Sequence, residues 1–356
     1  MSFTVAMLNL AKSFSSKPAR NYGHAALSES QLSEVEVVVR PILAQLEALR
    51  RQTLRNIDFR AAWMIPVFFV GGFAFGMLIE RETPVFSALM YGAVGAMGGW
   101  ACAFTSLNNT YRRAYKSHVI PHLAACFGDL GYRPAVEPDL KRLAKLGLIP
   151  GFGVKKVEDE ILGAYRGVPV NIVEARLETG GKNSRIVFNG LLAELSFPGR
   201  FSGVTVVAKD GGLLGNTLRA FVQASGLERV RLEDPRFEER YQVYSGDQIS
   251  ARALLTPAVM ERLMELERHT QGDPPRLVAE YGTLRVALSK GNTEDLFEPP
   301  SIADPVGGSE MLLELSSDIG SVLRIVDAVL ELAPMAAPAT AARRGAVPTI
   351  RPARPT

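Results

Sequence analysis

The chain of 356 residues is 47% apolar and 22% charged, and its formal net charge is +3. This composition allows a folded domain with a sizeable core. So small a charge, with no basic domain, indicates no nucleic-acid partner. The only two cysteines, Cys102 and Cys126, are too few for a disulfide framework and are typical of a protein in a reducing cytoplasm.

The N-terminal segment divides at residue 28. Residues 1–27 are weakly apolar and carry basic residues without an acidic one, so we expect a flexible N-terminus. Residues 28–60 follow an amphipathic helical pattern. Its apolar positions recur at alternating spacings of three and four: Leu32, Val35, Val39, Ile42, Leu46, Leu49 and Thr53.

This heptad-like pattern has two interpretations. It could form a coiled-coil stem that joins two copies of the chain into a homodimer through residues 28–60. Alternatively, it is an amphipathic helix lying on the protein's own soluble domain, which is the interpretation we favour. Pro41 lies inside the pattern and should kink the helix or divide it in two.

Two long uncharged stretches follow, at residues 61–79 and 83–111, separated by a short turn that contains Glu80, Arg81 and Glu82. Each stretch is long enough to cross the roughly 30 Å hydrocarbon core of a bilayer as a helix. Residues 61–110 are therefore predicted to form a transmembrane helical hairpin with the lipid bilayer as its partner. Neither stretch contains an ionisable residue that would mark an ion path, which argues against a transporter.

Five glycines in this hairpin lie at spacings that place small residues on one helix face: Gly72 and Gly76 in the first stretch, then Gly92, Gly95 and Gly99 in the second. Small residues allow helix backbones to approach closely in lipid, where van der Waals packing drives association. We expect them to pack the two helices against each other.

Basic residues flank the predicted hairpin on both sides. Arginines precede the first stretch and basic residues follow the second: Arg50, Arg51, Arg55 and Arg60, then Arg112, Arg113 and Lys116. Because Lys and Arg resist translocation, both termini are expected in the cytoplasm and the tight turn outside.

A helix at residues 111–127 is predicted to continue the second stretch. Along one of its faces lie His118, His122 and Cys126. Imidazole and thiolate groups are zinc ligands, but three ligands on successive turns of one straight helix cannot converge on one ion. At most two could bind, so we favour a structural role and expect no metal or other cofactor.

The soluble part, residues 111–332, mixes helices and strands. The pattern predicts a short helix at 138–148 and strands at 160–165, 168–177, 185–197, 203–208, 230–232, 237–244, 276–281 and 283–288. Further helices are predicted at 247–255, 256–269 and 309–332. Consecutive strands with short connections pair antiparallel, so the predicted fold class is α+β with an antiparallel sheet and flanking helices. Residues 333–356, rich in Ala, Pro and Arg, are expected to be disordered.

The sequence predicts no catalytic residue. No Walker lysine follows the glycines at 211–215, Lys182 has no upstream glycine-rich loop and lies between predicted strands, and no serine lies in a nucleophile elbow. The paired carboxylates Glu233–Asp234 and Glu238–Glu239 are neighbours in sequence, so on a strand they would point to opposite faces.

A run of residues nevertheless carries a resemblance. Tyr-Gln-Val-Tyr-Ser-Gly-Asp at 241–247 and Ala-Arg-Ala-Leu-Leu-Thr-Pro at 251–257, with the shorter matches at 188–190, 201–203, 232–234 and 295–298, are similar to a bacterial membrane-protein family known only as domain of unknown function 3137. The resemblance covers roughly residues 100–300, and members carry a paired-helix membrane segment ahead of the domain. It implies a bacterial membrane protein and no activity that a residue could inherit.

Within that run, Tyr244, Asp247 and Arg252 are weak candidates for a binding site. Arg252 follows Asp247 by about one helical turn, within reach of an ion pair, and Tyr244 could offer its hydroxyl to the start of the helix. A strand-to-helix junction fixed by capping and an ion pair is the simpler interpretation. A groove for a ligand or partner at that junction is the alternative.

We therefore expect a non-enzymatic binding or scaffolding module held at the cytoplasmic face of the inner membrane, with a protein partner or lipid head groups as its ligand. The alternative is an enzyme of unrecognised type that acts on a membrane-proximal substrate.

Overall fold

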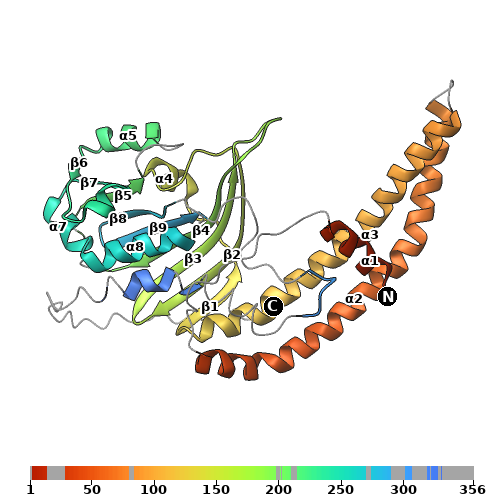
Figure 1. Cartoon of the computed structure of the whole chain (residues 1–356), viewed down its shortest axis with the longest axis horizontal. Helices are drawn as coiled ribbons and strands as arrows, with labels where there is room; N and C mark the ends of the chain where they lie inside the picture. The colour runs from red at the N-terminus through yellow and green to blue at the C-terminus, as the bar shows by residue number, and fades with distance from the viewer. Residues whose placement is uncertain are drawn as a thin grey trace, which may run out of the picture.

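The structure is a computed structural model and describes residues 2–13, 29–79, 84–197, 201, 203–209, 215–269, 274–289, 301–306, 319–320, 322–327 and 330. It has two parts, a long helical hairpin and a nine-stranded antiparallel sheet with helices on both faces (Figure 1). The predicted α+β class is confirmed. The turn at 80–83 and the tail at 333–356 lie outside the described residues, as does most of the helix predicted at 309–332.

The hairpin consists of α2 (Glu29–Ile79) and α3 (Pro84–Ala125). With 51 residues, α2 is about 77 Å long, far more than a bilayer core needs. We call residues 61–79 and 84–103 the apolar half, and residues 29–60 and 104–125 the stalk. Helix α2 continues through Pro41 and Pro66, so the predicted division at Pro41 is wrong. Extensive packing of α2 against α3 offsets the backbone hydrogen bonds that the prolines remove.

Helix α1 (Phe3–Ser13) lies within the segment for which composition indicates a flexible N-terminus. The backbone N–H and the hydroxyl of Thr4 both donate to Asp58 Oδ1 of α2, over 2.9 and 2.6 Å. Val5 and Leu8 pack against the main core. The helix is ordered by contacts with residues more than 40 positions away, which local composition does not reveal.

The sheet has the strand order β1-β2-β3-β4-β9-β8-β5-β7-β6, and every neighbouring pair is antiparallel. The strands are β1 (Asp129–Pro134), β2 (Val154–Tyr165), β3 (Val168–Glu178), β4 (Ile186–Ser196), β5 (Val204–Lys209), β6 (Glu228–Val230), β7 (Tyr241–Ser245), β8 (Arg276–Glu280) and β9 (Thr283–Ser289). Most predicted strands are present. The strand predicted at 237–244 is instead α6 (Pro235–Glu238) followed by β7, because Asp234 caps the N-terminus of a short helix by accepting from the backbone N–H of Arg236.

Each face of the sheet carries its own core. Alternate side chains point to opposite faces, so Ile172 of β3 joins one cluster and Leu177 the other. The larger cluster includes α7 (Gln248–Leu254), α8 (Pro257–His269) and the stalk. The smaller one lies beneath α4 (Leu140–Lys145) and α5 (Gly215–Ala224). The stalk is thus part of the same core as the sheet.

Candidate functional site

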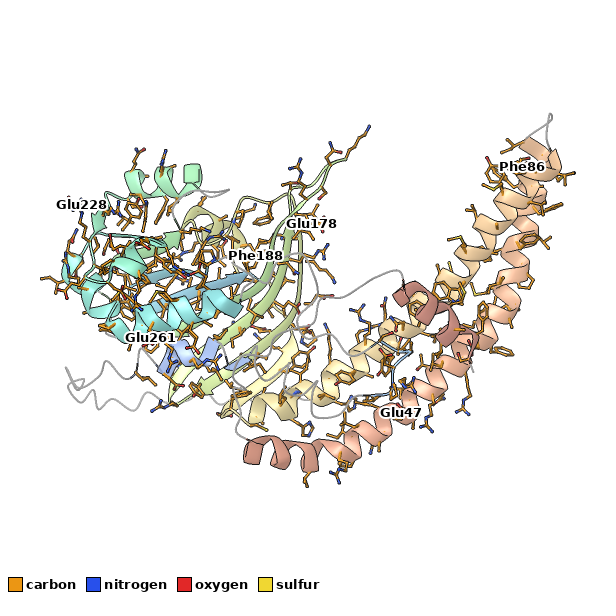
Figure 2. All side chains as sticks on the ribbon, in the orientation of Figure 1. Glu47, Phe86, Glu178, Phe188, Glu228 and Glu261 are labelled. Atoms are coloured by element: carbon orange, nitrogen blue, oxygen red, sulfur yellow. The ribbon has the colours of Figure 1, made fainter. Side chains whose placement is uncertain are left out.

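The apolar half of the hairpin exposes large hydrophobic side chains around its surface. Leu78 is 82% exposed, Met97 72% and Phe86, near the end of the hairpin, 69% (Figure 2). Others exposed there include Trp63, Val67, Val70, Phe75, Met77, Ile79, Val85, Leu89, Met90 and Val94. A helix in a soluble core would bury such residues. The hairpin thus has two helices long and apolar enough to cross a membrane.

The inner face of the hairpin is built from the five glycines singled out in the sequence. A Cβ added to Gly72 would lie 2.2 Å from the carbonyl oxygen of Tyr91, and one added to Gly95 would lie 2.2 Å from that of Phe68. The corresponding distance from Gly76 to Ala88 Cα is 2.6 Å. A Cβ added to Gly92 would lie 2.9 Å from the ring of Phe69, and one added to Gly99 would lie 2.8 Å from the carbonyl oxygen of Met64. At four of these five glycines, the backbone of the facing helix therefore leaves no room for a side chain.

The stalk is joined to the sheet through a buried ion pair, which we call the anchor. Lys116 Nζ of α3 donates to Asp159 Oδ2 of β2 over 2.6 Å, and the two side chains are 9% and 3% exposed. The hydroxyl of Tyr132 on β1 donates to the other carboxylate oxygen of Asp159, also over 2.6 Å. Burial and this hydrogen bond to a carboxylate raise the pKa of Tyr132. The anchor therefore connects a hairpin helix to two strands.

Asp159 occupies a β-bulge. The pairing of β2 with β3 shifts between Val157 and Glu160, so Glu158 and Asp159 both lie opposite Glu174. A bulge places an extra residue and redirects its side chain. The next residue, Glu160, is 1% exposed and accepts from Arg133 and from Asn171 Nδ2, the latter over 2.9 Å. The hydrogen bond from Arg133 lowers the pKa of Glu160.

A second connection holds α2. Arg50 donates to Glu47 over 2.8 Å and to the carbonyl oxygen of Ile302 over 2.8 Å. The backbone N–H of Val306 donates to Glu47 Oε2 over 3.1 Å. Residues 301–306 therefore form a strap across the stalk. The hydrogen bond from Arg50 is the largest cause that lowers the pKa of Glu47 to about 2.

We expect the strap to weaken in acid. Because the pKa of Glu47 is lower in the folded chain than its ordinary value of 4.5, its stabilisation is complete above pH 4.5 and is lost as the pH falls toward 2. Glu47→Gln should lower the free energy of unfolding by about 1–2 kcal/mol at pH 7 and by much less near pH 2. Urea unfolding at both pH values measures this. Glu261→Gln, at an exposed position of α8, is the control. A deficit that is equal at both pH values would contradict the prediction.

The predicted metal-ligand candidates lie along one exposed face at the end of α3, with Cys126 one residue beyond the helix. The ring Nδ1 of His118 is 2.6 Å from the carbonyl oxygen of Ala114, and that of His122 is 2.8 Å from the carbonyl oxygen of His118. The thiol of Cys126 donates to the carbonyl of His122 over 3.1 Å. Each side chain therefore contacts the preceding turn of its own helix. Among the described residues, no group of three or more His, Cys, Asp or Glu side chains could hold a metal ion.

The structure divides the Tyr244, Asp247 and Arg252 candidates between the two faces of the sheet. Asp247 caps α7 by accepting from the backbone N–H groups of Ile249 and Ser250. Tyr244 packs with the cluster on the other face, and its hydroxyl donates to Gln242 over 2.5 Å rather than to the helix start. Arg252 is exposed and donates to the carbonyl oxygens of Gln248 and Arg231, both over 3.4 Å. These contacts describe a capped strand-to-helix junction.

The anchor is the part of the site that sequence reasoning missed. In the sequence, Lys116 is recognisable only as one of the basic residues that flank the hairpin, and Asp159 lies just before a predicted strand. The available signal was the run Glu158-Asp159-Glu160 next to an apolar strand, since three adjacent acids beside a core require partners.

Comparison with known proteins supports part of this account. Residues 186–330 match a family model described as a protein of unknown function (DUF3137). The match begins at β4 and includes the run at 241–257 that carries the resemblance in the sequence. It leaves the hairpin, β1–β3 and the anchor outside. No curated protein and no solved structure matches the chain.

Proposed function

We propose that this protein is a non-enzymatic binding or scaffolding module, held at the cytoplasmic face of a bacterial inner membrane by a two-span hairpin. The observation that supports this most strongly is the exposed apolar half of the hairpin, continued by an uninterrupted stalk into the buried Lys116–Asp159 pair. An apolar surface of this size needs lipid or a partner to cover it. The rigid stalk then fixes the sheet domain near the membrane.

The orientation follows from charge. Arg55 and Arg60 precede the apolar half of α2, and Arg112 and Arg113 follow that of α3. Both groups lie at the same end of the antiparallel hairpin, the end that carries the sheet. Under the positive-inside rule this end, with both termini, faces the cytoplasm.

Several pKa shifts in the described part of the chain have structural causes and therefore mark no catalytic group. In the described part of the chain, the pKa values of Glu47, Glu160 and Glu178 are lowered chiefly by hydrogen bonds with neighbouring side chains, which also hold the fold together. Burial in packed cores accounts for the raised pKa of Tyr115. Catalytic sites instead perturb groups that face a substrate.

The test is purification of the full-length protein from membranes in mild detergent, followed by identification of what co-purifies. We expect a protein partner in stoichiometric amount that is retained at low salt. The comparison variant is Asp159→Ala, which weakens the junction between the sheet and the stalk but keeps the same tag and the same spans. Loss of the partner in this variant indicates a site that needs the sheet and stalk together.

A different outcome would favour the enzyme alternative. If the eluate contains no protein partner but a tightly held small molecule, the module interpretation fails. The molecule would then identify the substrate class. Recovery of the protein in the soluble fraction, without detergent, would contradict membrane attachment itself.

A further inference from the structure

Two lengths in the molecule agree. Lys116 lies 13 residues beyond Ala103, the end of the apolar half, and this is about 20 Å along a helix. On the sheet, Glu174 lies opposite Asp159 of the anchor. From Glu174, β3 runs four residues to its end at Glu178, about 13 Å, and the loop adds four residues to Lys182. Fully extended, these eight residues would span about 26 Å, so the level at which the apolar half begins lies within the reach of the loop.

The direction also agrees. The ends of β3 and β4 that carry this loop rise on the same side as the apolar end of the hairpin (Figure 1). Glu178, at the end of β3, and Phe86, at the end of the hairpin, both lie in the upper part of the molecule (Figure 2). The opposite end of β3, where it follows β2, points away from the apolar end of the hairpin (Figure 1).

The loop has the chemistry for anionic head groups. Residues 179–185 read Thr-Gly-Gly-Lys-Asn-Ser-Arg, with two basic side chains and no acid. Lys182 and Arg185 are exposed, and among the described residues neither has an acidic partner. By contrast, Arg166 at the other end of the strands is paired with Asp327 over 2.7 Å.

The loop is also ordered. Ser184 Oγ accepts from the backbone N–H of Gly180 over 3.2 Å and donates to Glu178 over 2.9 Å. The backbone N–H of Arg185 donates to the hydroxyl of Thr179 over 3.0 Å. Gly180 and Gly181 have φ angles of 81° and 82°, which a side chain would disfavour. An ordered loop loses little conformational entropy on binding.

We infer that the β3–β4 loop touches the cytoplasmic surface of the membrane and that Lys182 and Arg185 bind anionic lipid head groups. This inference rests on the proposed membrane attachment. The sheet is then held to the bilayer at two places, through the hairpin and through the loop, and its orientation depends on the lipid composition. Each basic residue near such a surface raises the ratio of membrane-bound to free loop about fivefold.

The experiment uses the full-length protein in nanodiscs. A fluorophore is attached to Asn183→Cys and quenched by lipids that carry a spin label in the head group. Pro169→Cys, exposed at the other end of β3, is the matched control, and both native cysteines are replaced by Ala. In equal parts of phosphatidylglycerol and phosphatidylcholine, we expect strong quenching at Asn183 and weak quenching at Pro169.

Replacing Lys182 and Arg185 with Glu should reduce quenching at Asn183 by about half or more, as should nanodiscs of phosphatidylcholine alone. Equal quenching at Asn183 and Pro169 would overturn the inference. Quenching at Asn183 that does not depend on the charge of the lipid or of the loop would also overturn it. A third variant keeps Cys102, which is exposed in the apolar half, as its single labelled cysteine. It separates the loop contact from the membrane attachment. If this label is shielded from quenchers in the acyl chains, the membrane attachment itself is wrong.

Discussion

Gly95→Leu is expected to separate the two hairpin helices. The first atom of any side chain at this position would lie 2.2 Å from the backbone oxygen of Phe68, so the helices must move apart along the apolar half. Overpacking of this kind costs about 3 kcal/mol, and Gly72→Leu, 2.2 Å from Tyr91 O, should cost as much. Both tryptophans of the chain, Trp63 and Trp100, lie in the apolar half. Their fluorescence during thermal unfolding in detergent therefore reports on the hairpin.

Neighbouring glycines provide the controls. An added Cβ at Gly71 meets nothing within 4 Å, and one at Gly98 meets only a side-chain atom of Phe68 at 4.0 Å. Gly71→Leu and Gly98→Leu add the same bulk to the outer surface of the same helices. We expect their unfolding temperatures to stay near that of the wild type. Equal decreases in unfolding temperature for Gly95→Leu and Gly98→Leu would mean that the helices do not pack through the glycine face.

Asp159→Ala should have the second large effect. It leaves the ammonium group of Lys116 buried without its carboxylate and removes the acceptor of the Tyr132 hydroxyl. Breaking a buried ion pair by removing one partner costs about 3–5 kcal/mol. Urea unfolding followed by circular dichroism measures the loss.

Two variants distinguish this cause from a general loss of charge. Glu137→Gln breaks an exposed ion pair with Lys155 and should cost at most about 1 kcal/mol. The combination of Lys116→Met, Asp159→Leu and Tyr132→Phe removes every polar group of the anchor and should recover most of the stability lost in Asp159→Ala. If the combined variant is as unstable as Asp159→Ala, the cost does not come from an unpaired buried charge.

The hairpin could be predicted in detail because its determinants are local in sequence. The absence of charge at 61–79 and 83–111 fixes two helices, and the four-residue spacing of Gly72 and Gly76 fixes the face that packs. The structure places both glycines against α3. The buried face of the stalk was also predictable, since Leu46 and Thr53 of the seam are both buried within the chain, whereas the continuity of the helix through Pro41 was not.

The junction with the sheet could not be predicted, because its determinants are separated along the chain. Lys116 and Asp159 are 43 residues apart, and Asp159 faces the helix only because of a bulge. Strand β1 has only six residues and ends at Pro134, so its alternation of apolar and polar residues is too short to recognise in the sequence. The strap depends on a contact between Arg50 and Ile302, 252 residues apart. Such pairings are set by the tertiary fold, and periodicity does not report them.

The proposed topology places the hairpin across the membrane and the sheet in the cytoplasm. The most direct test labels single cysteines at Thr83 and Pro169 with a membrane-impermeant thiol reagent in spheroplasts, with both native cysteines replaced by Ala. We expect Thr83→Cys to react in intact spheroplasts and Pro169→Cys to react only after detergent is added. Labelling of both positions from the same side would show that the hairpin does not cross, and would contradict the account.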